Sequence, residues 1–170
     1  MKTWIKKTGI LSGAISLTML LCTNAVFAVS ALPKQAYLPL EMAQKAADTA
    51  LQTCKKDGYM VSVTVVDRSG VVKVVLRGDG AGPHTLGSSA GKAYTAASMK
   101  RATLGLANFI KDKPALHGLR DMDDRMLILG GGLPIKIGGE VVGGIGVGGA
   151  PGGHLDEACA KAGIQSLTQF

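Results

Sequence analysis

The sequence contains three histidines, His84, His117 and His154, whose ring nitrogens can bind a metal ion. Each lies beside glycine or proline in an expected loop or helix start, where a solvated or structural role is the default. No two of them have the short spacing of a zinc-binding pair, so we expect no dedicated zinc site. His84 differs from the others because it lies between a glycine-rich segment and an alanine-rich helix, where small side chains leave room for a ligand.

Other residue types give no catalytic pattern. Asp121, Asp123 and Asp124 lack the spacing of a cation-binding loop, which indicates a solvated loop instead. Serines are frequent, but none stands in the G-x-S-x-G turn of a nucleophilic serine. The single tryptophan is Trp4, so the chain beyond the N-terminal segment offers no tryptophan on which a sugar or base could stack.

Glycine is frequent, with 24 residues, and many of them lie near the C-terminus. The segment 144–149, GIGVGG, matches the dinucleotide-binding pattern G-x-G-x-x-G. That fingerprint requires a following helix, a second strand and an acidic residue about 20 positions on. The chain ends at Phe170 after one expected helix, so we do not expect nucleotide binding.

Alternation along a β-strand explains the spacing of these glycines better than a nucleotide-binding motif does. In an extended segment Gly144, Gly146 and Gly148 share one face, while Ile145 and Val147 share the other. A face without side chains weakens a strand unless something lies close against it. A packed helix, another subunit and a flat ligand all meet this requirement.

The elements that must position these residues follow from periodicity and turn residues. Asp67–Gly70 and Gly138–Gly139 each join two strands, which predicts an antiparallel sheet with helices packed on it, an α+β fold. The expected order is a helix over 39–56, strands over 60–66 and 71–77, helices starting at Ser88 or Ser89 and at Thr103, strands over 126–129, 133–137 and 140–147, and a helix from about His154.

The N-terminus has the three parts of a secretion signal. Lys2, Lys6 and Lys7 precede an apolar run over 10–21, and small residues lead to Ala28. The run is too short to span a bilayer comfortably, so we expect cleavage after Ala28 and no stable membrane anchor. The sequence therefore predicts a signal peptide over 1–28 and a single domain over 29–170, in the periplasm or secreted.

The charge of the expected mature chain is mild. The whole sequence has a net charge of +7, but three of its 19 basic residues and none of its 12 acidic residues fall within 1–28, which leaves 16 against 12, or +4. The remaining basic residues are scattered. This argues against nucleic acid as a partner and leaves a weak attraction for acidic small molecules.

Two cysteines remain after removal of the segment that contains Cys22. Cys54 and Cys159 each lie on the apolar stripe of an expected helix. An even pair in an oxidising compartment favours a disulfide if the two helices lie side by side. Two buried free thiols are the alternative.

Five ordered motifs resemble the GlcG/HbpS-like family, which includes the C-terminal domain of PduO-type proteins. The likeness extends over about 40–167. The motifs are VTVVDRSG at 63–70, RGDGA at 77–81, KAYTA at 92–96, GGGLPI at 130–135 and VGGIGV at 142–147.

The resemblance implies a profilin-like domain, with an antiparallel sheet of about five strands and the N- and C-terminal helices on one face. It places Cys54 and Cys159 on neighbouring helices. Members of the family form homo-oligomers up to octamers, and several bind haem. A glutamate-pair iron motif of one relative has no counterpart here, because Glu41 is the only glutamate before Glu140.

The resemblance also suggests a haem site. The residues expected there are His84 as axial ligand of the iron, Tyr94, Thr95 and Thr103 as pocket groups, Arg77 and Lys92 as partners of the propionates, and Gly144 and Gly146 on the bare strand face.

From these observations we expect an exported haem- or tetrapyrrole-binding protein without turnover chemistry of its own, assembled as a tetramer or octamer. One alternative is an accessory protein or enzyme acting on small organic acids in an oxidation or degradation pathway. The other is an oligomeric scaffold whose glycine-rich face serves only subunit packing.

Overall fold

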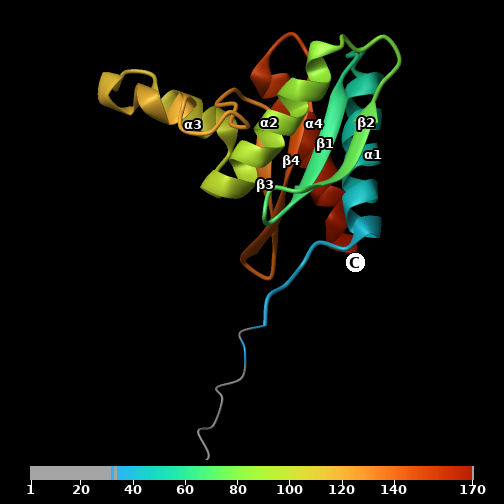
Figure 1. Cartoon of the computed structure of the whole chain (residues 1–170). Coiled ribbons are helices and arrows are strands. Elements are labelled where there is room, and N and C mark those ends of the chain that lie inside the picture. The colour runs from blue at the N-terminus through green and yellow to red at the C-terminus, as the bar shows by residue number, and fades with distance from the viewer. Residues whose placement is uncertain (1–31, 33, 170) are drawn as a thin grey trace, which may run out of the picture. The chain divides into compact units, whose positions relative to one another are not determined.

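A computed structural model of the chain describes residues 32 and 34–169. The expected signal peptide, 1–28, lies outside the described residues. The described part forms a four-stranded antiparallel sheet in the order β2-β1-β4-β3 (Figure 1). Its strands are β1 (Ser62–Asp67), β2 (Val72–Arg77), β3 (Gly132–Ile137) and β4 (Glu140–Gly148).

Helices cover both faces of the sheet, and the first and last long helices share one face, as the family resemblance implies. The helices α1 (Leu40–Lys56) and α4 (Gly153–Gln165) pack against each other on that face, and α2 (His84–Met99) crosses the opposite face (Figure 1). After α2 come the short helix α3 (Thr103–Ile110) and the 3-10 helix η1 (Pro114–Arg120). A second 3-10 turn, η2 (Ser166–Gln169), follows α4.

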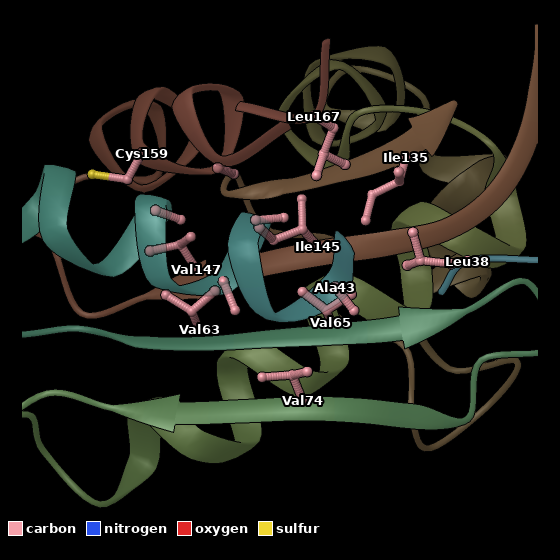
Figure 2. Close-up of a cluster of buried hydrophobic side chains, with 14 of the residues drawn as sticks. Leu38, Ala43, Val63, Val65, Val74, Ile135, Ile145, Val147, Cys159 and Leu167 are labelled. Carbon is pink, nitrogen blue, oxygen red and sulfur yellow. The ribbon is translucent and has the colours of Figure 1, made fainter. Parts of the chain in front are cut away.

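The main core lies between the sheet and the pair α1 and α4. Alternate residues of the central strands, among them Val63, Val65, Ile145 and Val147, point into this layer and are fully buried (Figure 2). The helix α1 meets them with small side chains, which let its backbone come close to the sheet. These alanines are Ala43, Ala46, Ala47 and Ala50.

The glycine face of β4 is covered by α2. A Cβ atom built on Gly144 would collide with the backbone of Ala93, and one built on Gly146 would collide with the backbone of Ser89. Of the three coverings that the sequence allows, a packed helix is the one observed. Because α2 fills this face, neither another subunit nor a flat ligand can lie against it. This removes the basis of the scaffold alternative and shows that the expected haem site on Gly144 and Gly146 is wrong.

Hydroxyl pairs fasten α2 to the neighbouring strand β1. Ser62 bonds Thr85 with an oxygen–oxygen distance of 2.7 Å, and Thr64 bonds Ser89 at 2.8 Å. All four side chains are buried. The helix is therefore held to the sheet by directional contacts as well as by its close approach to the glycines.

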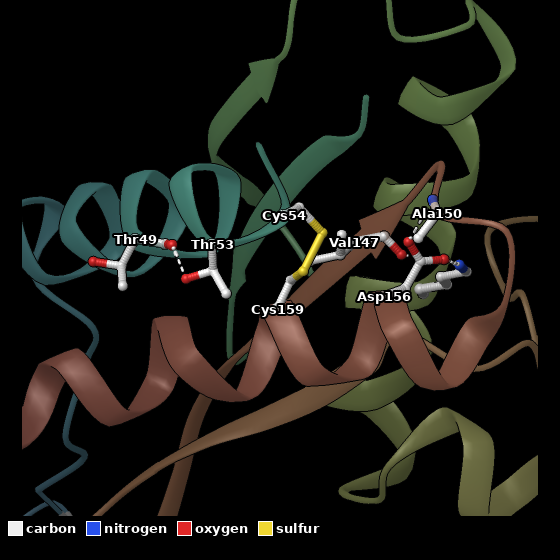
Figure 3. The surroundings of a disulfide bond; sticks show 8 residues. Thr49, Thr53, Cys54, Val147, Ala150, Asp156 and Cys159 are labelled. Atoms are coloured by element: carbon white, nitrogen blue, oxygen red, sulfur yellow. Dashed lines mark hydrogen bonds and ion pairs between the residues drawn. A yellow bond between two sulfur atoms is a disulfide. The ribbon is translucent and has the colours of Figure 1, made fainter. Parts of the chain in front are cut away.

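Two covalent or ionic links join distant segments. Cys54 of α1 and Cys159 of α4 form a disulfide, with 5.6 Å between their Cα atoms (Figure 3). Lys92 of α2 lies 2.7 Å from the carboxylate of Asp156 in α4 and also donates to the carbonyl of Val147 at 2.9 Å. Both members of this ion pair are buried.

Two sequence-based expectations are wrong in detail. The described sheet has four strands instead of five, because residues 126–129 form an irregular segment. The N–H of Leu127 donates to the side chain of Thr95, at 2.7 Å, and not to a neighbouring strand. The second helix begins at His84, a turn before the expected serines, because Pro83 has the φ of −61° that suits a helix start.

Within residues 32 and 34–169, none of the helices combines the length and apolar character needed to cross a membrane.

Candidate ligand-binding cleft

A cleft of about 420 Å³ opens between α2, the turn that joins β1 to β2, and the segment 124–127. This volume lies within the range of small-molecule sites in proteins, roughly 300–1,000 Å³. We call it the α2 cleft.

The floor of the α2 cleft is a face of α2 with little side-chain bulk. Gly87, Ser88, Gly91 and Tyr94 line the cleft at spacings of three and four residues, which places them on one side of the helix. A Cβ atom built on Gly87 would meet no atom within 4 Å. A ligand can therefore approach the backbone of α2 directly.

One wall of the cleft is apolar and belongs to the edge strand β2. Val72 pairs with Val66, which packs against α2, so both side chains point to the α2 face of the sheet. Val75 lies further along β2 and pairs with Thr64, whose hydroxyl bonds Ser89 of α2, so it shares that face. Because α2 does not cover the edge strand, Val72 is 52% exposed and Val75 is 46% exposed.

The opposite wall comes from residues 124–127 and is fixed to α2 by Thr95. The hydroxyl of Thr95 donates to the carbonyl of Gly91 at 2.8 Å and accepts the N–H of Leu127 at 2.7 Å. Met126 and Leu127 supply the apolar atoms of this wall. Thr95 itself is fully buried, so it supports the cleft without facing it.

A charged cluster closes one end of the cleft. Tyr94 donates its hydroxyl to Asp123 at 3.1 Å, and Arg125 binds the same carboxylate through Nε at 3.0 Å and Nη2 at 2.7 Å. The guanidinium of Arg125 also lies 4.3 Å from the centre of the Tyr94 ring. Its side chain is 65% exposed, so the cleft has a cation at its rim.

The same cluster sets the protonation of its members. Hydrogen bonds from Arg125 hold the pKa of the Asp123 carboxyl well below its usual range. Partial burial, followed by the hydrogen bond to Asp123, raises the pKa of Tyr94. At neutral pH the rim therefore carries a neutral phenol, a carboxylate and a guanidinium.

His84 is not among the residues that line the α2 cleft. It is the first residue of α2, one turn before Gly87 and Ser88 on the same side of the helix, and its side chain is exposed. Its ring lies over Gly82, where an added Cβ would come within 2.6 Å of a ring carbon.

The other expected site residues lie away from the α2 cleft. Lys92 is engaged by Asp156 in the interior, so its ammonium group is not available to a propionate. Thr103 is buried and accepts the N–H of Gly132 at 2.8 Å. Gly144 and Gly146 lie beneath α2. Arg77, at the far end of β2, lines a separate cleft.

Sequence reasoning missed the residues 124–127 as a wall because it interpreted 126–129 as a strand. It also missed the glycines of α2, because it expected this helix to begin at Ser88 or Ser89, after Gly87. Pro83, a residue type that favours the start of a helix, is the signal that could have placed Gly87 and Gly91 on one helix. No group of three or more His, Cys, Asp or Glu side chains placed to hold a metal ion occurs in the described residues.

The fold and the cleft define a profilin-like α+β domain with a ligand-sized cleft beside its edge strand. A family model described as haem-degrading protein HbpS-like matches residues 38–165. The chain belongs to this HbpS-like family.

Known proteins of similar sequence and structure agree with this assignment. The chain is 31% identical over 115 residues to an uncharacterised 15.0 kDa protein of Citrobacter freundii from the dhaT–dhaS intergenic region, which covers 67% of this chain and 81% of that protein. A crystal structure of a double mutant of HbpS from Streptomyces reticuli is 46% identical, with a TM-score of 0.74 over 80% of this chain and 90% of that one. A crystal structure of a PduOC–haem complex is 26% identical, with a TM-score of 0.72 over 77% of this chain and 95% of that one.

Proposed function

We propose that the protein binds haem, or a similar tetrapyrrole, in the α2 cleft. The observation that carries the proposal is the open floor at Gly87 beside apolar walls, because a flat macrocycle needs a smooth surface to lie against. The similarity to a structure of a PduOC–haem complex gives independent support.

The residues around the cleft fit the two chemical characters of haem. Val66, Val72, Met126 and Leu127 offer apolar contacts to the ring. Arg125 at the rim is a cation suited to a propionate, a role that the sequence assigned to Arg77 and Lys92. Haem supplies an iron ion that takes an axial protein ligand such as histidine. His84, exposed at the end of the same helix face, is the residue that we assign to this position.

Binding without turnover is part of the proposal. The hydroxyl of Tyr94 already donates to Asp123, so this phenol is not free to give its proton to a ligand in the cleft. The family description speaks of haem degradation, and this makes a direct test necessary. Holoprotein incubated with ascorbate and oxygen should keep its Soret band, whereas loss of the band with release of iron would overturn this part of the proposal.

Titration of the purified protein with hemin tests the binding itself. We expect a shifted Soret band that saturates at a fixed stoichiometry and changes its position in His84→Ala. The control is His154→Ala, because His154 is also exposed near a helix start with its ring over a glycine two positions earlier. A Soret band that does not shift with the wild-type protein would contradict haem binding. A wild-type spectrum in His84→Ala would contradict the assignment of His84 as axial ligand.

A second variant tests the location of the ligand. Gly87→Leu places a side chain into the open space above the floor of the cleft, so we expect haem affinity to fall by tenfold or more while the far-UV circular dichroism is unchanged. Undiminished hemin binding in this variant would show that haem binds elsewhere on the protein.

We further propose that the protein acts outside the cytoplasm as a homo-oligomer. The buried disulfide supports an oxidising compartment, and the N-terminal sequence supports cleavage after Ala28. Fractionation of cells that express the full chain should place it outside the cytoplasm with an N-terminus at Val29, and light scattering should give a mass of several chains. A cytoplasmic protein would contradict the location, an uncleaved protein would contradict the signal peptide, and a monomer would contradict the homo-oligomer.

A further inference from the structure

A second cleft, of about 430 Å³, lies at the C-terminal end of α1 and shares no lining residue with the α2 cleft. Its lining comes from the last turns of α1, from the segment 58–61 and from the segment 77–79 at the end of β2. We call it the α1 cleft. The haem proposal makes no use of it.

One cation of the α1 cleft is Lys55. The backbone at the end of α1 is already capped, because Gly58 donates to the carbonyl of Lys55 at 3.1 Å and Tyr59 donates to that of Cys54 at 2.9 Å. The ammonium group of Lys55 is therefore not needed to cap the helix. Neither of the ion pairs formed within residues 34–169 includes Lys55.

The other cation, Arg77, is held in one orientation. Its guanidinium donates to the carbonyl of Ala81 through Nε, at 2.9 Å, and through Nη2. This contact leaves the N–H groups of Nη1 free for an acceptor. A guanidinium fixed in this way loses little conformational entropy when it binds a carboxylate.

The rest of the lining limits the kind of anion. Leu51, Tyr59 and Met60 supply apolar surface, which favours a ligand with a hydrocarbon part over a bare inorganic anion. Asp79 is the one carboxylate of the lining, and its charge opposes a second negative charge on the ligand. Two cations and one anion therefore match a singly charged acid.

We infer that the α1 cleft binds small organic monocarboxylates. The carboxylate lies between Lys55 and Arg77, and the hydrocarbon part of the ligand packs on Leu51, Tyr59 and Met60.

Amide NMR of the wild-type protein, titrated with butyrate, tests the inference. We expect saturable shifts at residues 58–61 and 77–79, and no such shifts with butyramide, which has the same shape without the charge. Inorganic phosphate, which lacks the hydrocarbon part, should bind more weakly than butyrate. Absence of saturable shifts with butyrate, equal shifts with butyramide, or shifts confined to residues 87–91 would overturn the inference.

A matched pair of variants tests the role of Lys55. Lys55→Gln should weaken butyrate binding by about tenfold, the usual effect of losing one charge-assisted hydrogen bond. Lys56→Gln removes the same charge from the next residue, which is exposed but does not line the cleft, and should leave binding unchanged. Equal loss in both variants would indicate attraction by net charge and not a site.

The haem proposal and the carboxylate proposal can be tested independently of each other. Lys55→Gln should leave the hemin titration unchanged, and Gly87→Leu should leave the butyrate titration unchanged, because the two clefts share no lining residue. If hemin instead produces the shifts at 58–61 and 77–79 and competes with butyrate, the α1 cleft belongs to haem and the carboxylate assignment is wrong.

Discussion

Lys92 is 2% exposed, and its ammonium group lies between a carboxylate and a backbone carbonyl. The sequence could not reveal this, because lysine is ordinarily exposed and its partner, Asp156, is 64 positions further along the chain. The same limit applied to Thr95 and Thr103. The family resemblance suggested ligand contacts for them, whereas their hydroxyls are used by backbone groups of distant segments.

The buried ion pair leads to a prediction about stability. Lys92→Met leaves the carboxylate of Asp156 buried without its cation, so we expect the free energy of unfolding to fall by about 3–5 kcal/mol. The double variant Lys92→Met with Asp156→Leu should recover much of this loss, because no charge is then left unpaired. Urea unfolding at neutral pH measures both, and a single variant as stable as the wild type would show that the pair is dispensable.

A second charged residue of α4 predicts a pH dependence. Burial raises the pKa of Glu157, and its Oε2 atom has no hydrogen-bond partner. The folded protein therefore keeps this proton to a higher pH than the unfolded chain, so the contribution of Glu157 to stability is full at acid pH and is lost as the pH rises through its folded-state pKa.

Glu157→Gln should remove this part of the pH dependence. Between about pH 4 and 8 the unfolding free energy of the variant should rise relative to that of the wild type. Glu140→Gln, at the exposed first residue of β4, is the control and should follow the wild-type curve. Parallel curves for Glu157→Gln and wild type would show that the carboxyl is as well solvated as in the unfolded chain.

Among the elements, α2 has two functions: one side packs on the glycines of β4, and another forms the floor of the α2 cleft. Alternation in β4 predicted the bare face correctly, but three coverings were consistent with it, and only the three-dimensional arrangement selects the helix. For the segment 126–129 the prediction from the local pattern was itself wrong. Its apolar run suited a strand, but its backbone is satisfied by Thr95, a contact without a local sequence pattern.

Two glycine variants separate these two sides of α2. Gly146→Ala should lower the free energy of unfolding by about 1–3 kcal/mol, because the new methyl group collides with the backbone of Ser89. Gly87→Ala lies on the same helix with open space above it, so it should keep or raise stability by up to about 1 kcal/mol through helix propensity. Thermal unfolding compares them, and equal effects would mean that α2 and β4 are not closely packed.

For the molecule as a whole, most of the fold could be predicted from the sequence. Helical and strand periodicity located nearly all elements, and the five ordered motifs supplied their arrangement through the family resemblance. The α2 cleft could not be predicted, because its floor, its valine wall and its 124–127 wall come from three separate parts of the chain. The disulfide between Cys54 and Cys159 could be predicted only in part, because the helical spacing was also consistent with two free thiols.

The disulfide between α1 and α4 should contribute strongly to global stability. It joins residues 105 positions apart, and closing a loop of this length is worth about 4–5 kcal/mol in the chain-entropy model. The double variant Cys54→Ala with Cys159→Ala should unfold at a correspondingly lower urea concentration.

Addition of a reductant should destabilise the wild type and leave the double variant unaffected. Mass spectrometry of the untreated protein should show the two cysteines lighter by two hydrogens in total. Two thiols that react with an alkylating agent after denaturation without reductant would refute the bond.

The contact between α1 and α4 also determines when folding can be completed. The alanine stripe of α1 is buried in part by α4, the last long helix to be synthesised, and the central strand β4 also comes late in the chain. A nascent chain that ends before Gly153 can pack that stripe on the sheet, but it lacks the cover of α4 and the partner of Cys54. The main core is therefore completed only once α4 has been synthesised, so the last helix sets the point at which the domain gains its full stability.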